Sequence, residues 1–220
     1  MRLWLISDHP VIPQTTAEKA YDLSALRRWA VALVQQGHQV YWLLSTRSLQ
    51  ALHAEVALAP VAVDTLPVTC RYVVPVQPYQ LAGIHIFCVD QHVWQHADLH
   101  TRLFTFLCLF QRALACDVLH AWGALAVAYL AVYTARFLAV PAMVSYDWQI
   151  RSAKSQQPFL WDWVARQVAA AVVPSVAERE RLLTLSPLMS AQVHVIEPTQ
   201  PEVGRTLTAL YARLCGIAMS

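Results

Sequence analysis

Residues 2–45 read RLWLISDHPVIPQTTAEKAYDLSALRRWAVALVQQGHQVYWLLS, and this stretch decides the fold. Two apolar runs, RLWLIS (2–7) and QVYWLLS (39–45), have the length and composition of buried strands. Between them, apolar residues recur at three- and four-residue spacing, which predicts a helix over 16–36 with Gly37 as its C-cap. A strand, a helix and a second strand within about 45 residues form the crossover unit of a parallel sheet.

The same alternation continues along the chain. Strands are expected at 83–89, 117–121, 141–147, 171–175 and 192–198, and helices at 93–114, 123–138, 158–170, 176–185 and 202–215. The stretch 47–78 contains four prolines and is less regular, with short strands expected at 61–66 and 70–76. The pattern predicts an α/β protein with a single Rossmann-like, doubly wound, mostly parallel sheet.

The composition agrees with a large core and narrows the range of partners. The 220 residues are 57% hydrophobic and 14% charged, whereas a typical charged share is about 25%. So few charges imply strands buried on both faces, as in a parallel α/β sheet. The net charge of +2 and the absence of a Lys/Arg run argue against a nucleic-acid partner.

The cysteines and the apolar segments bear on the compartment. None of the five cysteines forms a C-x-x-C pair, which favours buried, reduced thiols in a cytoplasmic protein over a disulfide or a zinc site. The first apolar run is too short for a signal peptide. The segment 123–144 is apolar enough to suggest a membrane span, but Arg136 and Pro141 interrupt it and favour a helix followed by a strand. Membrane contact is therefore expected to be peripheral at most.

Polar and aromatic residues follow the carboxyl ends of several predicted strands. Right-handed crossovers place these loops at one edge of the sheet, where ligands bind. Aromatic rings beside Asp and His suit a sugar, because rings stack on apolar sugar faces and carboxylates bind hydroxyls. The candidates for binding a sugar acceptor are Asp8, His9, Thr15, Thr16, Trp122, Tyr146, Trp148, Arg151, Lys154 and Ser175, with Asp147 and His120 as candidate catalytic groups.

Simpler roles remain open for single members of this group. Asp8 and Ser175 could cap the helices that follow them, and Trp122 and Trp148 could belong to the core. The histidines at 92, 96 and 100 could line one helix face as metal ligands, although a packed or solvated helix is favoured and no metal is predicted. With five glycines in the chain, neither G-x-G-x-x-G nor a P-loop is present, and there is no G-x-S-x-G elbow.

The order of four segments resembles that of GT-B glycosyltransferases, especially the large retaining, GT4-like family. VALVQQGHQVYWLL (31–44) resembles that family's "LA…L…GHEV" passage, and DVLHAWG (117–123) resembles "DVIHAHG". PAMVSYDWQ (141–149) is similar to "P-x-V-x-T-x-H-D". AAAVVPSVAERERLL (169–183), followed by QVHVIEP (192–198), is similar to "ADAVIAVSE…RERL" and "VIPNGVD".

The resemblance implies the N-terminal, acceptor-side domain of such an enzyme. In that family two Rossmann-like domains face each other; the first binds the acceptor and the second binds the sugar nucleotide. Residues 1–198 match the first domain, and 199–220 match the last helix, which packs back on it. We therefore expect the donor-binding domain to be missing, a separate donor-domain subunit to be a partner, and a sugar or a lipid-linked acceptor to be the ligand. No cofactor is implied.

Departures from the family pattern affect catalysis. The glycine pair that the full enzymes place after the first strand is replaced around Gln14-Thr15-Thr16, where a Cβ would hinder a donor phosphate. Tyr146 stands where a His is expected, although Asp147 remains; His120 is present, but Trp122 replaces the second His.

Three functions are compatible with these patterns. The first is the acceptor half of a hexosyl transferase, which either works with a separate donor-binding subunit or is derived from a transferase and no longer catalytic alone. The second is a non-catalytic module, derived from a transferase, that binds a carbohydrate or a protein. The third is a small complete enzyme with Asp147 or His120 as its base and with Arg151 and Lys154 holding an anion. We expect catalysis by the isolated chain to be absent.

Overall fold

The computed structural model describes residues 1–8, 23–61, 74–90, 92–93, 97–123, 125–146, 158–187 and 192–217. Its elements, in order, are β1 (Arg2–Asp8), α1 (Leu23–Gln35), β2 (Gln39–Ser45), α2 (Thr46–Glu55), β3 (Ala59–Pro60), β4 (Val76–Leu81), β5 (Ile84–Val89), α4 (Ala97–Leu114), β6 (Val118–Gly123), α5 (Leu125–Leu138), β7 (Ala142–Ser145), α7 (Pro158–Gln167), β8 (Ala170–Val173), α8 (Val176–Leu185), β9 (Val193–Val195) and α9 (Val203–Leu214).

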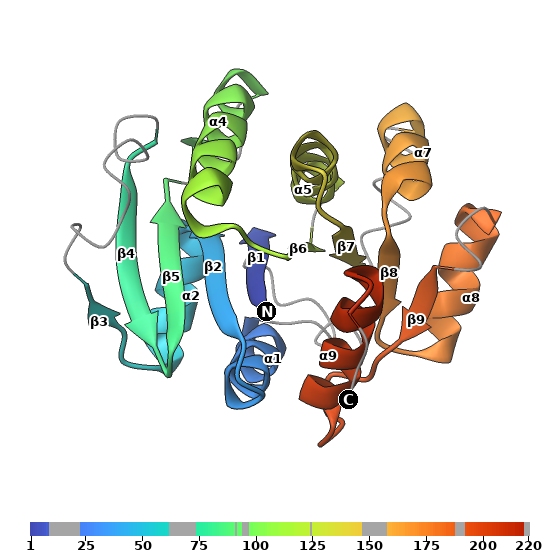
Figure 1. Ribbon diagram of the computed structural model, residues 1–220, viewed down its shortest axis with the longest axis horizontal. Coiled ribbons are helices and arrows are strands. Elements are labelled where there is room, and N and C mark those ends of the chain that lie inside the picture. The colour runs from blue at the N-terminus through green and yellow to red at the C-terminus, as the bar shows by residue number, and fades with distance from the viewer. Residues whose placement is uncertain are drawn as a thin grey trace.

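All the described strands form one sheet, in the order β3-β4-β5-β2-β1-β6-β7-β8-β9. Seven strands are mutually parallel: in sheet order, β5, β2, β1, β6, β7, β8 and β9. Strand β4 is antiparallel to β5, and β3 is antiparallel to β4. Helices α4, α5 and α7 cover one face, and α1 and α9 cover the other (Figure 1). This is the predicted Rossmann-like, doubly wound, mostly parallel α/β fold, and that prediction is confirmed.

Alternation along β1 shows how the sequence fills both faces of the sheet. Trp4 and Ile6 belong to the core under α4 and α5, whereas Leu3 and Leu5 belong to the core under α1 and α9. The Trp4 ring packs against Phe110 of α4, with 4.4 Å between the ring centroids. A strand buried on both faces has to be apolar at every position, which is why the run 3–6 contains no polar residue.

Helix α9 lies directly against α1. A Cβ built on Gly204 would stand 3.0 Å from the Cβ of Ala32 and 3.1 Å from its carbonyl oxygen. The Nε2 atom of His38 lies 2.7 Å from the Thr208 hydroxyl. Glycine thus lets the two helix backbones approach closely, and a polar contact fixes their relative position.

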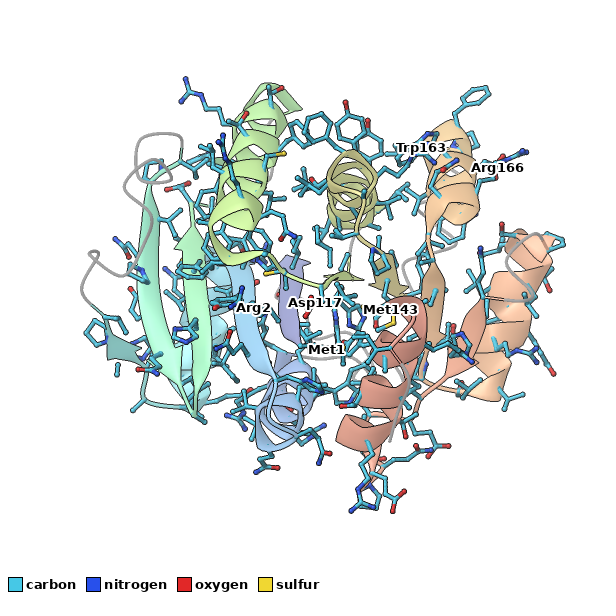
Figure 2. The ribbon with its side chains drawn as sticks, in the orientation of Figure 1. Met1, Arg2, Asp117, Met143, Trp163 and Arg166 are labelled. Atoms are coloured by element: carbon cyan, nitrogen blue, oxygen red, sulfur yellow. The ribbon has the colours of Figure 1, made fainter. Side chains whose placement is uncertain are left out.

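A polar cluster holds the amino end of β1, and Figure 2 shows Met1, Arg2 and Asp117 close together there. The Arg2 amide donates to Asp117 Oδ2 at 2.7 Å, and the Arg2 guanidinium donates to the Leu114 carbonyl at 2.6 Å. The Met1 ammonium lies 3.3 Å from Nδ1 of His38. These groups stand at the edge of the sheet opposite the carboxyl ends of the parallel strands, and their partners within the chain give them a structural role.

The region after β2 differs from the prediction. Helix α2 was not expected; it buries Leu49 and Leu52, and Ser45 caps it by accepting from the Ser48 amide at 3.3 Å. Its short apolar stripe was hidden in a segment that we expected to be irregular. The strands predicted at 61–66 and 70–76 fall largely on residues outside the description, and the observed neighbours are β3 and β4.

The hairpin joining β4 to β5 has a two-residue connection with a glycine requirement. Ala82 and Gly83 both have positive φ angles, 48° and 83°. Two positive φ values in a two-residue loop match the primed turns that fit the twist of a hairpin. A Cβ at Gly83 would also lie 2.9 Å from Cγ1 of Val34.

The apolar segment 123–144 divides between α5 and β7, as predicted. Within the described part of the chain, no helix combines the length and the apolar character needed to cross a membrane.

The described cysteines are free thiols, and two of them are buried. Burial raises the pKa of Cys88 and of Cys116 to about 12, with the carboxylates of Asp90 and Asp117 adding to the effect. Because the thiolate is the reactive form, we expect neither thiol to be alkylated by iodoacetamide at pH 8 in the folded protein, and both to be alkylated in urea. Peptide mapping after each treatment measures this, and labelling of Cys88 or Cys116 in the folded protein would contradict it.

Candidate functional site

The strand order reverses direction at β1. After β1 the chain forms one side of the sheet, with β2 beside β1, β3 at the outer edge, and β4 and β5 between them; it then crosses over to place β6 on the other side of β1. In doubly wound sheets, ligands bind outside the carboxyl ends of the strands at such a switch point. Here those ends are Asp8 of β1 and Gly123 of β6, which are paired in the sheet register.

Gly123 has a φ of 107° at the end of β6, a region of backbone conformation that favours glycine. The glycine that closes the DVLHAWG segment therefore suits the backbone conformation at the last residue of β6, directly beside the end of β1.

Several predicted site residues lie outside the described part of the chain, and Asp8 is described only as the last backbone position of β1. Those outside are His9, Thr15, Thr16, Asp147, Trp148, Arg151 and Lys154. Their assignment stays a prediction. The described members of the predicted group are His120, Trp122, Tyr146 and Ser175.

His120 lies within the core, at the centre of a hydrogen-bonded chain of three side chains. Its Nδ1 atom lies 2.7 Å from the Tyr211 hydroxyl of α9, and its Nε2 atom lies 2.7 Å from the Ser145 hydroxyl of β7. A neutral imidazole has one donor and one acceptor, and a hydroxyl can serve as either, so both contacts are satisfied. The His120 side chain joins β6, β7 and the last helix.

The surroundings of His120 keep its ring neutral. Its residue exposure is 1%, and burial lowers its pKa well below the ordinary value of 6.5. The unfolded chain binds a proton at this residue below about pH 6.5, whereas the folded chain does not.

This difference in protonation predicts how stability changes with pH. The contribution of His120 to stability is fully present above pH 6.5 and decreases as the pH falls from 6.5 toward the lowered pKa of the folded state, by at most about 1.4 kcal/mol per pH unit. His38 and His194, whose pKa values are also lowered mainly by burial, act in the same direction. Urea unfolding at pH 7.0, 6.0 and 5.0 measures how the free energy of unfolding changes with pH. A variant that combines His120→Leu with Ser145→Ala and Tyr211→Phe lacks this imidazole and should show a smaller change. Equal changes in the two proteins would contradict the assignment.

Trp122 also points into the core. Its ring packs against Trp29 of α1, with centroids 4.4 Å apart, and against His120, with centroids 4.7 Å apart. Nearby, the Trp29 indole donates to the Pro198 carbonyl at 3.3 Å, and the Trp42 indole donates to the Ser7 hydroxyl at 2.9 Å. These indoles form the packed layer directly beneath the switch point.

Tyr146 lies on the opposite face of the sheet. It is 3% exposed, and its ring packs against Trp161 of α7 with centroids 5.1 Å apart. Burial raises the pKa of its hydroxyl. Among the described residues, that hydroxyl has no hydrogen-bond partner.

Ser175 has a structural role in the described part of the chain. Its hydroxyl accepts from the Glu178 amide at 3.2 Å and caps the amino terminus of α8. This is the capping role that the sequence left open beside a role in binding.

The two partners of His120, Ser145 and Tyr211, were not predicted from the sequence. Tyr211 is 91 positions away in sequence, and no local spacing relates the two residues. Ser145 interrupts an otherwise apolar strand, and that polar residue in a strand expected to be buried was the one available signal. No group of three or more His, Cys, Asp or Glu side chains in the described ranges could hold a metal ion.

The fold has known counterparts among solved structures. The chain aligns with UDP-GlcNAc 2-epimerase from Methanocaldococcus jannaschii (TM-score 0.54, 12% identity), covering 89% of this chain and 45% of that one. It aligns with UDP-GlcNAc 2-epimerase from Neisseria meningitidis bound to UDP-GlcNAc (TM-score 0.52, 10% identity), covering 99% and 52%. It also aligns with Arabidopsis thaliana UGT89C1 complexed with UDP (TM-score 0.53, 9% identity), covering 97% and 56%.

These alignments establish the GT-B-like fold, and the chain spans about half the length of each of these proteins. No protein-family model and no curated protein matches the sequence.

Proposed function

We propose that this chain is the acceptor-side half of a sugar transferase of GT-B architecture and that a separate polypeptide supplies the half that binds the sugar nucleotide. One observation carries the proposal: nearly the whole chain aligns with about half of enzymes whose structures contain UDP or UDP-GlcNAc. The reaction we propose is transfer of a hexosyl group to a sugar or a lipid-linked acceptor, in the cytoplasm.

In this proposal the acceptor binds at the carboxyl ends of β1 and β6. Asp8, His9, Thr15 and Thr16 follow the first of these strands. Asp147 follows β7 and is the candidate base for the acceptor hydroxyl, while Trp148, Arg151 and Lys154 contribute to binding. A base must reach the proton it removes, and a residue that directly follows a strand of this sheet is a candidate for that role.

His120 has a different role in this scheme. Because both ring nitrogens are engaged by hydroxyls and the side chain is sealed beneath α9, we assign it to positioning rather than to proton transfer. It holds β6, and with it Gly123, in place beside the end of β1.

The sequence that follows β1 supports a chain that binds the acceptor and leaves the donor to another polypeptide. Full-length enzymes of the resembling family place a glycine pair there, near the donor phosphates, whereas this chain has Gln14-Thr15-Thr16. Side chains at those positions favour contact with hydroxyl groups over close approach of the backbone to a phosphate.

The second candidate is a non-catalytic module that binds a carbohydrate or a protein with the same edge. The sealed position of His120 favours it, because one of the two candidate catalytic groups is then unavailable to a substrate.

Both candidate functions, the acceptor-side half of a transferase and a carbohydrate-binding module, require the chain to bind a glycan. A glycan array probed with the labelled chain tests this binding. We expect retention on a restricted set of glycans and its loss in Trp148→Ala and Arg151→Gln. Arg166→Gln, which removes an exposed arginine of α7 (Figure 2), is the matched control and should bind normally. If no glycan on the array retained the chain, binding of oligosaccharides at this edge would be contradicted.

Turnover separates the two candidates. We expect the isolated chain to transfer no sugar from UDP-glucose or UDP-GlcNAc to a retained glycan, and transfer to appear when the donor-side polypeptide is added. Sugar transfer by the isolated chain would contradict the proposal that a separate polypeptide binds the sugar nucleotide.

A further inference from the structure

A groove of about 650 Å³ runs along β9, at the end of the sheet far from β3. It is lined by β9 and Ile196, by Val176 and Arg179 of α8, and by Leu210 and Arg213 of α9. Helices α8 and α9 lie on opposite sides of β9 (Figure 1). Three strands separate β9 from β1, so this groove is distinct from the switch point.

The groove contains an open strand edge. Among the described strands, β9 pairs with β8 on one side and with none on the other. The Gln192 carbonyl accepts from the Ala171 amide at 2.9 Å, and the Ile196 amide donates to the Val173 carbonyl at 3.0 Å. Because alternate residues of a strand face the same neighbour, the backbone groups of Val193 and Val195 point to the open edge. Unpaired groups of this kind are a template for an added strand.

The groove is positively charged from both sides. Arg179 comes from the helix packed on one face of the sheet, and Arg213 comes from the helix packed on the other. Neither has a carboxylate partner within the described residues, and no Asp or Glu lines the groove. The Arg213 guanidinium lies 3.2 Å from Nε2 of His194, whose pKa is lowered by burial and by Arg213 itself. The neutral imidazole accepts from the guanidinium and holds it beside β9.

We propose that this groove binds an extended acidic segment of a partner protein, which adds to the sheet beside β9. Successive side chains of an added strand point to opposite faces of the sheet. Two adjacent acidic residues would therefore direct one carboxylate toward Arg179 and the other toward Arg213. The exposed apolar side chain of Val176 and the buried Leu210 offer contacts to apolar neighbours of the acidic pair.

The charges favour this occupant over a second copy of the chain. In a symmetric dimer formed through β9, the same arginines of both copies would meet across the interface. Like charges placed in this way are destabilising. A partner strand with acidic side chains supplies the complementary charge as well as the backbone hydrogen bonds.

The test uses the full chain and a fluorescein-labelled peptide of alternating Val and Thr residues with two adjacent Glu residues at its centre. We expect saturable binding by fluorescence anisotropy, and no binding when the backbone nitrogens facing β9 are methylated or when both Glu residues are replaced by Gln. Arg179→Gln and Arg213→Gln should each weaken binding about 5-fold or more, since each removes a charge-assisted contact.

Two other arginines of the same helices are matched controls. Arg181 pairs with Glu178, and Arg205 pairs with Glu202, and neither lines the groove. Arg181→Gln and Arg205→Gln should change the affinity less than about 2-fold. Thermal unfolding of all four variants checks that each folds like the parent chain.

Other outcomes would overturn the proposal. Equal binding of the methylated peptide would show attraction by charge without strand addition. Displacement of the peptide by millimolar inorganic phosphate with unchanged β9 amide signals would indicate a site for a small anion. A concentration-dependent dimer that loses its association in Arg179→Gln would assign the groove to a second copy. Absence of saturable binding up to 1 mM chain would exclude the acidic segment.

Discussion

Replacing His120 with leucine is expected to lower the free energy of unfolding by about 2–6 kcal/mol. The substitution places an apolar side chain of similar size in the core. It removes the two imidazole nitrogens, each of which is hydrogen-bonded to one hydroxyl. The hydroxyls of Ser145 and Tyr211 then remain buried without partners, at about 1–3 kcal/mol each. Urea unfolding followed by far-UV circular dichroism measures the loss.

A triple variant separates this effect from simple repacking. Combining His120→Leu with Ser145→Ala and Tyr211→Phe removes all three polar side-chain groups of this hydrogen-bonded cluster together. Replacing all partners by apolar groups of similar shape can be nearly neutral. We expect the triple variant to regain most of the lost stability; a triple variant as unstable as His120→Leu alone would show that the hydrogen bonds are not the cause.

Replacing Gly204 with valine is expected to lower the free energy of unfolding by about 1–3 kcal/mol. Its Cβ would stand 3.0–3.2 Å from the Cβ, carbonyl carbon and carbonyl oxygen of Ala32, and two of these are backbone atoms of α1 that cannot rotate away. The helix-forming advantage of valine over glycine, a few tenths of a kcal/mol, offsets part of this cost. Chemical denaturation of the variant measures the net change.

Variants of the facing helix and of an exposed position provide the controls. Ala32→Gly removes one of the three contacts and should rescue Gly204→Val in part, because the carbonyl group of residue 32 remains. Ala209→Val places the same side chain at an exposed position of α9 and should cost less than about 1 kcal/mol. If Ala209→Val were as harmful as Gly204→Val, close packing of α1 and α9 would not explain the effect.

The fold could be predicted because its signals are local. The apolar run at 3–6 and the strand–helix–strand pattern around it require a parallel sheet, and Gly37 ends α1 with a φ of 81°, as a C-cap glycine does. Helix α2 was missed because its apolar stripe is limited to Leu49 and Leu52 beneath a polar surface. Propensity alone does not distinguish such a segment from a loop.

The site was less predictable because burial depends on contacts distant in sequence. His120 and Trp122 follow one another at alternate positions of β6, and their type suggested a ligand site. Their actual surroundings are set by Tyr211 and Trp29, from α9 and α1, which no spacing in the sequence connects to β6. The segments that follow β1 and β7 in the sequence contain the remaining candidates, and their roles stay proposals.

The most direct test of the central claim is the native mass of the chain purified from its own host, with identification of whatever co-purifies. We predict a stoichiometric complex heavier than the 24.7 kDa chain, containing a second polypeptide that binds a UDP-sugar. A lone monomer or homodimer with no such partner would contradict a transferase divided between two chains.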